Sequence, residues 1–309
     1  MMLMLTVLLA SCQEASVLPQ SGGRPYEVLL VGDGGEVAEV LATDAEVLPQ
    51  REPCFDVTTL AADKLDARMK LARSIVEVRI DPTLTRSVVR YEKNVYARPQ
   101  MVVRVSAPSR EVLRRDMPRW APGLLQLLTR HEMNAAIATL RRKPNPKAAE
   151  AVREVFGAEM DIPATMQASK RGKDFLWFSN NTVQGMQNLC VYSFAPGNDF
   201  AKMRDSVMRS NIPGEEDGMF MQTVGESLKT EPMKERNVRG TIYRGLWEMH
   251  GDAMGGPFVA HAVVDSANQR ILVAEAFVYA PEATKRNKLR QMEAALYTLQ
   301  PKRKQETTR

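Results

Sequence analysis

Residues 258–281 read FVAHAVVDSANQRILVAEAFVYAP, and this stretch decides the predicted fold. Two apolar β runs flank a polar four-residue turn between Asp265 and Arg270, and the second run closes with Ala280-Pro281. Proline suits a helix entrance because its fixed φ and missing N–H cost nothing there, whereas inside a strand it removes a ladder hydrogen bond. The stretch therefore predicts two antiparallel strands followed by a helix, whose apolar stripe is Leu289, Met292, Leu296 and Leu299.

The same pattern occurs at two earlier places, VRVSAP at residues 103–108 and VYSFAP at residues 191–196. Each follows another β candidate, at Ile75–Ile80 and Phe175–Ser179. Strand pairs that alternate with helices are typical of α+β proteins. We therefore predict an α+β fold with antiparallel sheets and helices packed on one face. An internal duplication of strand-strand-helix units and the general chemistry of helix starts are both open as explanations of the recurrence.

Further β runs and helices are predicted from apolar spacing. The β runs are Tyr26–Val31 and Met101–Val105, and the helices are Leu60–Arg73, Pro122–Arg142 and Lys147–Phe156. Two closely spaced prolines in Lys143-Pro144-Asn145-Pro146 forbid one continuous helix there. This break separates a predicted N-terminal α+β domain, residues 25–145, from a C-terminal one, residues 146–301. Polar, aperiodic residues 225–239 are expected to form a long exposed loop.

The glycine-rich segment Gly32-Asp33-Gly34-Gly35 follows the first β run. It lacks the second half of a dinucleotide fingerprint and the Lys-Ser/Thr of a P-loop, so we interpret it as a turn. No cofactor is expected.

The N-terminus has the cleavage pattern of a bacterial lipoprotein. Residues 1–9 are almost wholly apolar, and Leu9-Ala10-Ser11-Cys12 places two small residues before a cysteine. The apolar run is about half the ~20 residues needed to span a bilayer. We expect a signal peptide over residues 1–11, lipid on Cys12 and a tether over residues 12–24. No basic residue precedes Cys12, which departs from the pattern and indicates a start codon upstream.

The overall composition is that of a globular protein. The 309 residues are 44% hydrophobic and 26% charged, which argues against disorder. The formal charge of +5 equals the excess of eight Lys/Arg over three Asp/Glu in residues 281–309. Only 6% of residues are aromatic, and a nucleic-acid binder would spread its basic residues over a face interleaved with aromatics, so nucleic acid is not an expected partner.

Lys285 and Arg286 fall in the predicted first turn of the last helix, where cations are unfavourable. Either solvent screens them, or an acidic surface or anionic lipid lies opposite. Together with Lys302, Arg303 and Lys304 of the basic tail, residues 302–309, they form a candidate patch for anionic lipid.

Four residues are candidates for chemistry. His250 and Asp252 share one face of an extended segment, and His261 lies in the next β run; these groups could hold zinc or act as acid and base. Ordinary polar or satisfied core residues are the favoured interpretation, and no metal site is predicted. Alternation across the Asp265–Arg270 turn places Glu275 on an apolar face, opposite Ala260. A buried carboxylate there is either functional or paired with an arginine, and pairing is favoured.

Cysteine usage and hydrolase motifs add little chemistry. Cys54 and Cys190 are either free thiols or a disulfide pair. There is no Gly-x-Ser-x-Gly elbow, and Trp177 and Trp247 are interpreted as core residues.

Several segments resemble an uncharacterised family of lipoproteins from Gram-negative bacteria, the Domain of Unknown Function 4837 family. The segments are Pro25–Val28, Gly172–Trp177, Arg204–Met208, Arg244–Trp247, Met254–Val259 and Phe277–Pro281. The resemblance covers residues 26–299 and implies an envelope lipoprotein, without an established activity or catalytic residue.

The leading hypothesis is a non-enzymatic binding or assembly module, held to a membrane by lipid on Cys12. An envelope protein or anionic lipid is the expected partner, and the absence of an aspartate after Cys12 favours the outer membrane. The alternative is an envelope hydrolase that uses residues 248–275.

Overall fold

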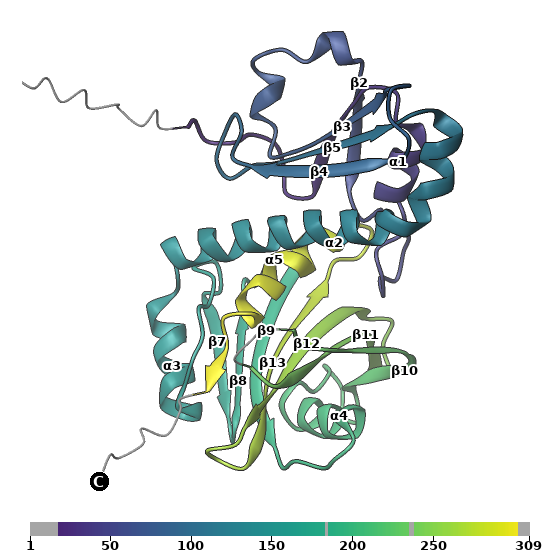
Figure 1. Cartoon of the computed structure of the whole chain (residues 1–309). Helices are drawn as coiled ribbons and strands as arrows, with labels where there is room; N and C mark the ends of the chain where they lie inside the picture. The colour runs from purple at the N-terminus through teal and green to yellow at the C-terminus, as the bar shows by residue number, and fades with distance from the viewer. Residues whose placement is uncertain (1–17, 183–184, 235–237, 302–309) are drawn as a thin grey trace, which may run out of the picture. The chain divides into compact units, whose positions relative to one another are not determined.

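A computed structural model of the chain describes residues 18–182, 185–234 and 238–301 (Figure 1). The expected signal peptide, Cys12 and the basic tail, residues 302–309, lie outside the described residues. The chain divides into two compact units. The first contains residues up to Gly34 together with Thr58–Leu113, and the second contains Gly35–Val57 and the residues from Arg114 onward. The α+β class is confirmed.

The first unit is built on a five-stranded sheet with the order β2-β1-β3-β5-β4. Its strands are β1 (Glu27–Val31), β2 (Asp56–Leu60), β3 (Ser74–Ile80), β4 (Val88–Lys93) and β5 (Met101–Ala107). β3 runs parallel to both β1 and β5, and β4 is antiparallel to β5, so the prediction of antiparallel sheets is wrong for this unit. Near-continuous apolar runs such as Met101–Val105 suit parallel strands, which are buried on both faces.

The helix predicted over residues 60–73 is wrong. Leu60 ends β2, and only two short 3-10 turns follow, at Ala62–Lys64 and Met69–Leu71. Of the apolar residues that suggested a helix, Leu60, Leu65 and Ala72 pack against the cluster of Ile75 and Val102, whereas Met69 is exposed. Their helical spacing is therefore a coincidence, because burial is achieved without a repeating turn.

The described end of the expected tether, residues 18–24, is bound to the first unit. The Ser21 amide donates to the Arg98 carbonyl at 3.2 Å, and the Gly22 amide donates to the Leu71 carbonyl at 2.8 Å. The Arg73 amide donates back to Gly22 at 3.1 Å. These residues extend the folded unit, so the prediction of a free tether is wrong for them.

The turn predicted at residues 32–35 is confirmed for residues 32–34, and Gly35 is the first residue of α1. Gly32 has φ of +92°, and a side chain there would collide with the Val78 carbonyl. The glycine is thus required by backbone conformation and by close packing.

The second unit contains a seven-stranded sheet with the order β10-β11-β12-β13-β9-β8-β7 (Figure 1). All neighbours in this sheet are antiparallel. The strands are β7 (Ala168–Gly172), β8 (Phe175–Ser179), β9 (Met186–Phe194), β10 (Phe220–Pro232), β11 (Gly240–His250), β12 (Gly255–Asp265) and β13 (Arg270–Tyr279). A small pair joins β6 (Ala158–Glu159) to β14 (Gln300–Pro301).

The expected loop over residues 225–239 is wrong for most of its described part, because β10 runs to Pro232. The register of β10 against β11 shifts between Val224 and Lys229. Such a bulge interrupts the alternation of side chains, which hides a strand from period-based analysis. Pro232 is tolerated because β10 is an edge strand.

Five helices accompany the described strands. They are α1 (Gly35–Leu41), α2 (Arg110–Arg142), α3 (Pro146–Phe156), α4 (Phe200–Asn211) and α5 (Arg286–Leu296). α2 begins at Arg110, where the Ser109 hydroxyl accepts from the Val112 amide at 3.3 Å, so the predicted start at Pro122 is wrong. The break at Lys143–Pro146 is confirmed. Asn145 caps α3 by accepting from the Ala148 amide, and Gly157 ends it with φ of +58°.

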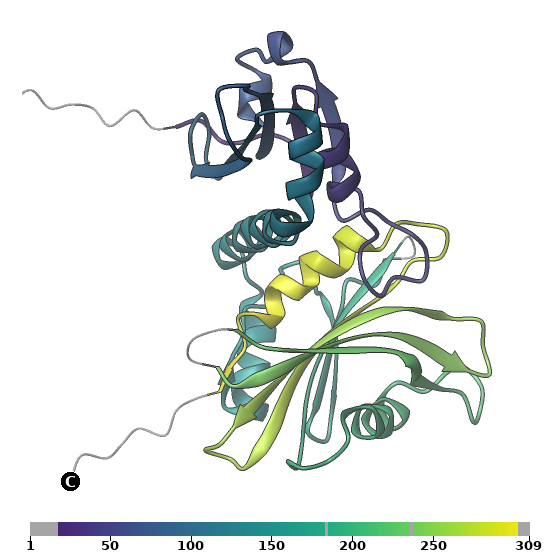
Figure 2. The same ribbon diagram turned by 45° about the vertical axis from the view of Figure 1, so that its right-hand side comes forward.

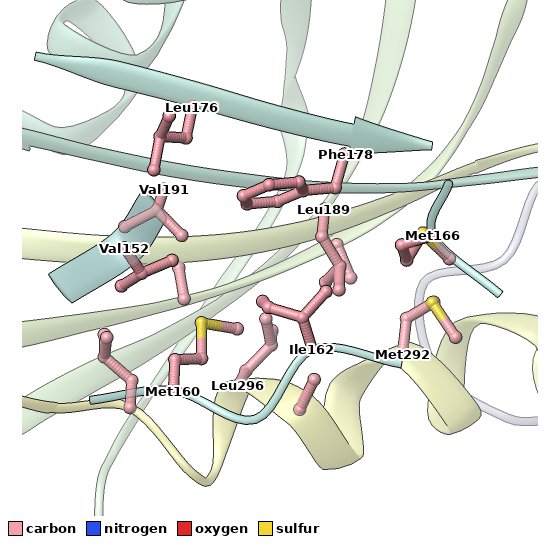
Figure 3. Packing of buried hydrophobic residues seen from close by; sticks show 14 of the residues in the cluster. Val152, Met160, Ile162, Met166, Leu176, Phe178, Leu189, Val191, Met292 and Leu296 are labelled. Carbon is pink, nitrogen blue, oxygen red and sulfur yellow. The ribbon is translucent and has the colours of Figure 1, made fainter. Parts of the chain in front are cut away.

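Helices lie on both faces of the seven-stranded sheet (Figures 1 and 2). α3 and α5 pack on one face through residues such as Val152, Met292 and Leu296 (Figure 3). α4 packs on the other face through Phe200 and Met208. The prediction that helices cover one face is therefore wrong, because strands with residues buried on both sides need a layer on each.

The strand, strand, Ala-Pro, helix pattern is confirmed at all three places, since β5, β9 and β13 each lead into a helix. The three are not equivalent. β8–β9 and β12–β13 are antiparallel neighbours, whereas β3 and β5 are parallel, with β4 between them in sequence. The first place therefore differs from the other two in topology.

Candidate functional site

Glu275 lies in the middle of β13 and is fully buried on the α4 face of the sheet. Its register partners are Ala260 in β12 and Cys190 in β9, which confirms the pairing expected from alternation. Arg204 of α4 donates from Nε at 3.1 Å and from Nη2 at 2.8 Å to the Glu275 carboxylate. The Tyr192 hydroxyl donates to the same carboxylate at 2.8 Å. The structure therefore confirms the favoured interpretation, in which the buried Glu275 carboxylate pairs with an arginine.

The surroundings of this pair exclude solvent. The Arg204 guanidinium lies 4.0 Å from the centre of the Phe258 ring, and neither Arg204 nor Glu275 is exposed. Burial, reinforced by the Glu275 charge, raises the pKa values of the Tyr192 hydroxyl and the Cys190 thiol well above their usual ranges. A sealed and fully paired carboxylate is suited to holding α4 on the sheet rather than to exchanging protons with a substrate.

His250 and Asp252 lie far from this pair, at an exposed end of the sheet. His250 is the last residue of β11 and stacks on Phe220 with ring centres 5.0 Å apart. Asp252 lies in the turn that follows and is exposed. His250 and Asp252 are therefore surface groups.

His261 lies on the opposite face of the sheet from Glu275. It pairs with Ile242 in register, is fully buried, and meets the Tyr297 ring edge-on at 4.5 Å. Its Nε2 lies 3.9 Å from the Glu293 carboxylate, beyond hydrogen-bond distance. The four candidate residues do not converge. Among the described residues, no group of His, Cys, Asp and Glu is placed to hold a metal ion.

The second unit contains an open cleft of about 1110 Å³. Its walls come from α2, α5, the segment around residues 45–54, and the neighbouring ends of β10 and β11. The α2 wall presents apolar residues, among them Leu125, Met133 and Ile137. Charged groups from β11 and α5, Arg244 and Glu293, also line the cleft. Ligand sites combine apolar surface with convergent polar and charged groups, and this lining contains both.

Arg244 and Glu293 form a bidentate ion pair. Nη1 and Nη2 of Arg244 donate to the Glu293 carboxylate at 3.2 and 2.6 Å. The Glu293 side chain is 4% exposed and that of Arg244 is 24% exposed. Burial by itself raises the pKa of Glu293, but the charge and hydrogen bonds of Arg244, with a further contribution from His261, together outweigh burial and hold this pKa well below its usual range. The pair is therefore fixed in its charged form.

The other cations at the cleft differ in how firmly they are held. Arg286 pairs with Asp56 at 2.8 Å, and Arg290 donates to the Cys54 carbonyl at 3.1 Å. Arg130 and Lys234 are exposed. Of these four cations, Arg130 and Lys234 are the two whose side chains are free to reorient toward a ligand.

The segment around residues 45–54 is held by the N-terminus of α5. Glu52 accepts hydrogen bonds from the Lys285 amide at 2.7 Å and from the Arg286 amide at 2.9 Å. The buried Glu52 carboxylate thus offsets the unfavourable placing of two cations in this first turn. Lys285 and Arg286 are each only 5% exposed, so of the alternatives weighed for them, an acidic partner is the one present. Neither belongs to an exposed basic patch, and Lys302, Arg303 and Lys304 lie outside the described residues.

Two family models match the chain. The first, described as Domain of unknown function (DUF4837), matches residues 145–298. Residues 145–298 of the chain belong to this family. A second model, Domain of unknown function (DUF8532), matches residues 21–141, so the resemblance noted at Pro25–Val28 lies outside the DUF4837 match. Arg244 and Glu293 thus belong to the DUF4837 part, whereas the α2 wall of the cleft belongs to the DUF8532 part.

Other comparisons add little. No curated protein matches the chain. Among solved structures, the chain is similar to the Ran-binding protein Mog1p of Saccharomyces cerevisiae, at 9% identity and a TM-score of 0.30, over 47% of this chain and 89% of that one. That likeness is too slight to carry an argument. In the part of the chain that the structure describes, no helix is long and apolar enough to cross a membrane.

Arg244 and Glu293 were missed as site residues, although both carry a signal in the sequence. Glu293 follows Leu289 by four residues, so it falls on the apolar stripe of the predicted last helix. A carboxylate in that position requires a buried partner, which is the argument that singled out Glu275. Arg244 stands within one of the DUF4837 segments, but nothing in the sequence pairs it with Glu293.

Proposed function

We propose that the protein is a lipid-anchored binding protein of the bacterial cell envelope, whose second unit takes a ligand into the α2–α5 cleft. The observation that carries the binding role is the open cleft with a bidentate arginine–glutamate pair in its lining, whose carboxylate is buried and whose guanidinium is partly exposed. Such a pair is costly to bury, and perturbed charges beside a cleft are enriched at functional sites.

Binding has more support than catalysis. Glu275 and Glu293 are each committed to an arginine, and His261 lies on the other face of the sheet from Glu275. Acid and base chemistry needs two groups within reach of one substrate. The hydrolase alternative over residues 248–275 therefore has less support than a binding role.

The anchor is proposed from Cys12 and the small residues before it. We expect cells that express the intact chain and are fed an alkyne fatty acid to label the protein and retain it in the membrane fraction. Cys12→Ser should abolish the label and release the protein, whereas Cys54→Ser should change neither. Labelling that survives Cys12→Ser would refute the anchor.

The cleft is tested by filling it. Gly123 lines the cleft on α2, and a Cβ added there meets no atom within 4 Å. Gly123→Trp should therefore occupy the cleft without disturbing the helix. We expect the neutral fluorescent probe phenylnaphthylamine to bind the wild-type protein and to bind Gly123→Trp at least about tenfold more weakly, a difference of about 1.4 kcal/mol.

The matched control is Ala138→Trp, which places the same side chain at an exposed position of α2 outside the cleft. It should bind the probe like the wild type. Equal binding by all three proteins, or no binding by any, contradicts a ligand site in this cleft.

A further inference from the structure

Arg244 presents one edge of its guanidinium group to a removable partner. The Nη1–Nη2 edge is taken by the buried Glu293 carboxylate. Nε and Nη2 face Glu231 of β10, each at 3.4 Å from its Oε1. These two contacts are long for charge-assisted hydrogen bonds, which prefer about 2.7–2.9 Å.

Glu231 is held weakly by comparison with Glu293. Its side chain is 51% exposed, against 4% for Glu293. It lies near the end of an edge strand and lines the cleft. An exposed ion pair of this kind contributes little stability, so another anion can replace it at small cost.

Glu293 prepares Arg244 to receive such an anion. By fixing one edge of the planar group, it sets the direction of the remaining two donors before a ligand arrives. Two parallel N–H donors match the two oxygens of a carboxylate, sulfonate or phosphate. Lys234 and Arg130, both exposed in the lining, add positive charge.

Part of the remaining lining is apolar and suits an apolar body. Leu125, Met133 and Ile137 of α2 stand in the same cleft as Ile242 and Leu289. A bare inorganic anion would leave this surface in water, whereas an apolar chain or ring on the anion would cover it.

We infer that the cleft binds an amphipathic oxyanion, with the anionic group on the Nε–Nη2 edge of Arg244 in place of Glu231. The inference rests on the proposed binding function and names the class of ligand. The chemistry is shared by free fatty acids, alkyl phosphates and the head groups of anionic lipids.

Two matched probes test the inference. Anilinonaphthalene sulfonate is phenylnaphthylamine with one added sulfonate, so the ratio of their dissociation constants isolates the anion. We expect the wild-type protein to prefer the sulfonate by about tenfold or more. Glu231→Gln should tighten sulfonate binding by about three- to tenfold and leave the neutral probe unchanged, because it removes the competing carboxylate.

Two further variants separate recognition from general charge. Glu226→Gln removes the same charge from an exposed position of β10 outside the cleft, and should leave both probes unchanged. The double variant Arg244→Gln, Glu293→Gln replaces the charged pair by two neutral side chains that can hydrogen-bond to each other, and should abolish the sulfonate preference while the neutral probe still binds.

The outcomes distinguish the two proposals. If phenylnaphthylamine enters the cleft but the sulfonate shows no preference, or Glu231→Gln does not tighten it, the inference fails and the binding function stands. If Gly123→Trp blocks neither probe, the binding function fails. Displacement by decyl phosphate but not by phosphatidylglycerol vesicles identifies a monomeric ligand, and displacement by the vesicles identifies a lipid head group in a bilayer.

Discussion

Glu275 and Glu293 are buried on opposite faces of one sheet, and each forms an ion pair with one arginine. Glu275 is sealed in an apolar layer with Arg204, whereas the Arg244 partner of Glu293 is partly exposed at a cleft. The same pair of residue types therefore serves two purposes. One holds a helix to the sheet, and the other orients a cation toward solvent.

Removing Glu275 should be strongly destabilising, because Arg204 would remain buried without a counter-charge. We expect Glu275→Gln to lower the free energy of unfolding in urea by about 3–5 kcal/mol. The double variant Arg204→Met, Glu275→Gln should recover most of this loss. The control Glu150→Gln breaks the pair with Arg153, in which both side chains are at least one-third exposed, and should cost about 1 kcal/mol or less. A similar small loss for Glu275→Gln would contradict a structural role.

Glu293 should make stability depend on acid. Its pKa is lower in the folded protein than the unfolded value near 4.5, so its contribution is present above that pH and is lost as the pH falls toward the folded pKa. We expect the unfolding free energy to decline below about pH 5. The slope should be shallower in Arg244→Gln, Glu293→Gln and unchanged in Glu226→Gln; equal slopes in all three proteins would count against this assignment.

At the scale of elements, α5 starts without a capping side chain of its own. Lys285 occupies the N-cap position and makes no side-chain cap. Glu52, from a segment remote in sequence, accepts the two amide hydrogens instead. The start of this helix is therefore determined by tertiary contact.

Glu52→Ala should expose the beginning of α5. We expect a loss of about 1–2 kcal/mol in unfolding free energy and faster hydrogen exchange at the Lys285 and Arg286 amides. Glu46→Ala, a change to an exposed carboxylate in the same segment, is the control and should leave that exchange unchanged. Unaltered exchange in Glu52→Ala would show that another group caps the helix.

The elements that the sequence predicted well are those with local signals. α3 has an asparagine cap, a proline in its first turn and a terminal glycine, and all three act within a few residues of the helix. In β12 and β13, apolar residues either alternate with other residues or follow one another without a break, and a short turn joins the two strands. Such signals need no knowledge of the rest of the chain.

The elements that were missed depend on distant residues. The segment after Leu60 shows helical spacing but gains its burial by lying against Ile75 and Val102. β10 is polar because it is an edge strand, and its bulge breaks the alternation. At the site, alternation placed Glu275 correctly. The Arg244–Glu293 pair, by contrast, joins a strand to a helix 49 residues later in the sequence, and no local sequence pattern predicts that contact.

At the scale of the whole molecule, the second unit is discontinuous in sequence. It includes Gly35–Val57, which lies between β1 and most of the first unit. The predicted boundary at residue 145 and the gap between the two family matches both separate this segment from α5, the helix whose start it caps.

A fragment of residues 144–301 should therefore be less stable than the intact chain. It lacks Glu52 and Asp56, and so loses the α5 cap and the partner of Arg286. We expect the calorimetric unfolding temperature of its sheet to fall, with a loss of about 2 kcal/mol or more. Glu52→Ala in the intact chain should reproduce part of the difference; an unchanged unfolding temperature would show that the segment is dispensable.

The Glu52 contact with α5 can form only late in synthesis of the polypeptide. Glu52 and Lys285 are 233 residues apart, and synthesis proceeds at about 5–20 residues per second, so the carboxylate leaves the ribosome about 10–50 s before its amides. During that interval Glu52 lacks the two amides that it binds in the folded protein. The C-terminal end of the chain thus determines when this contact can form.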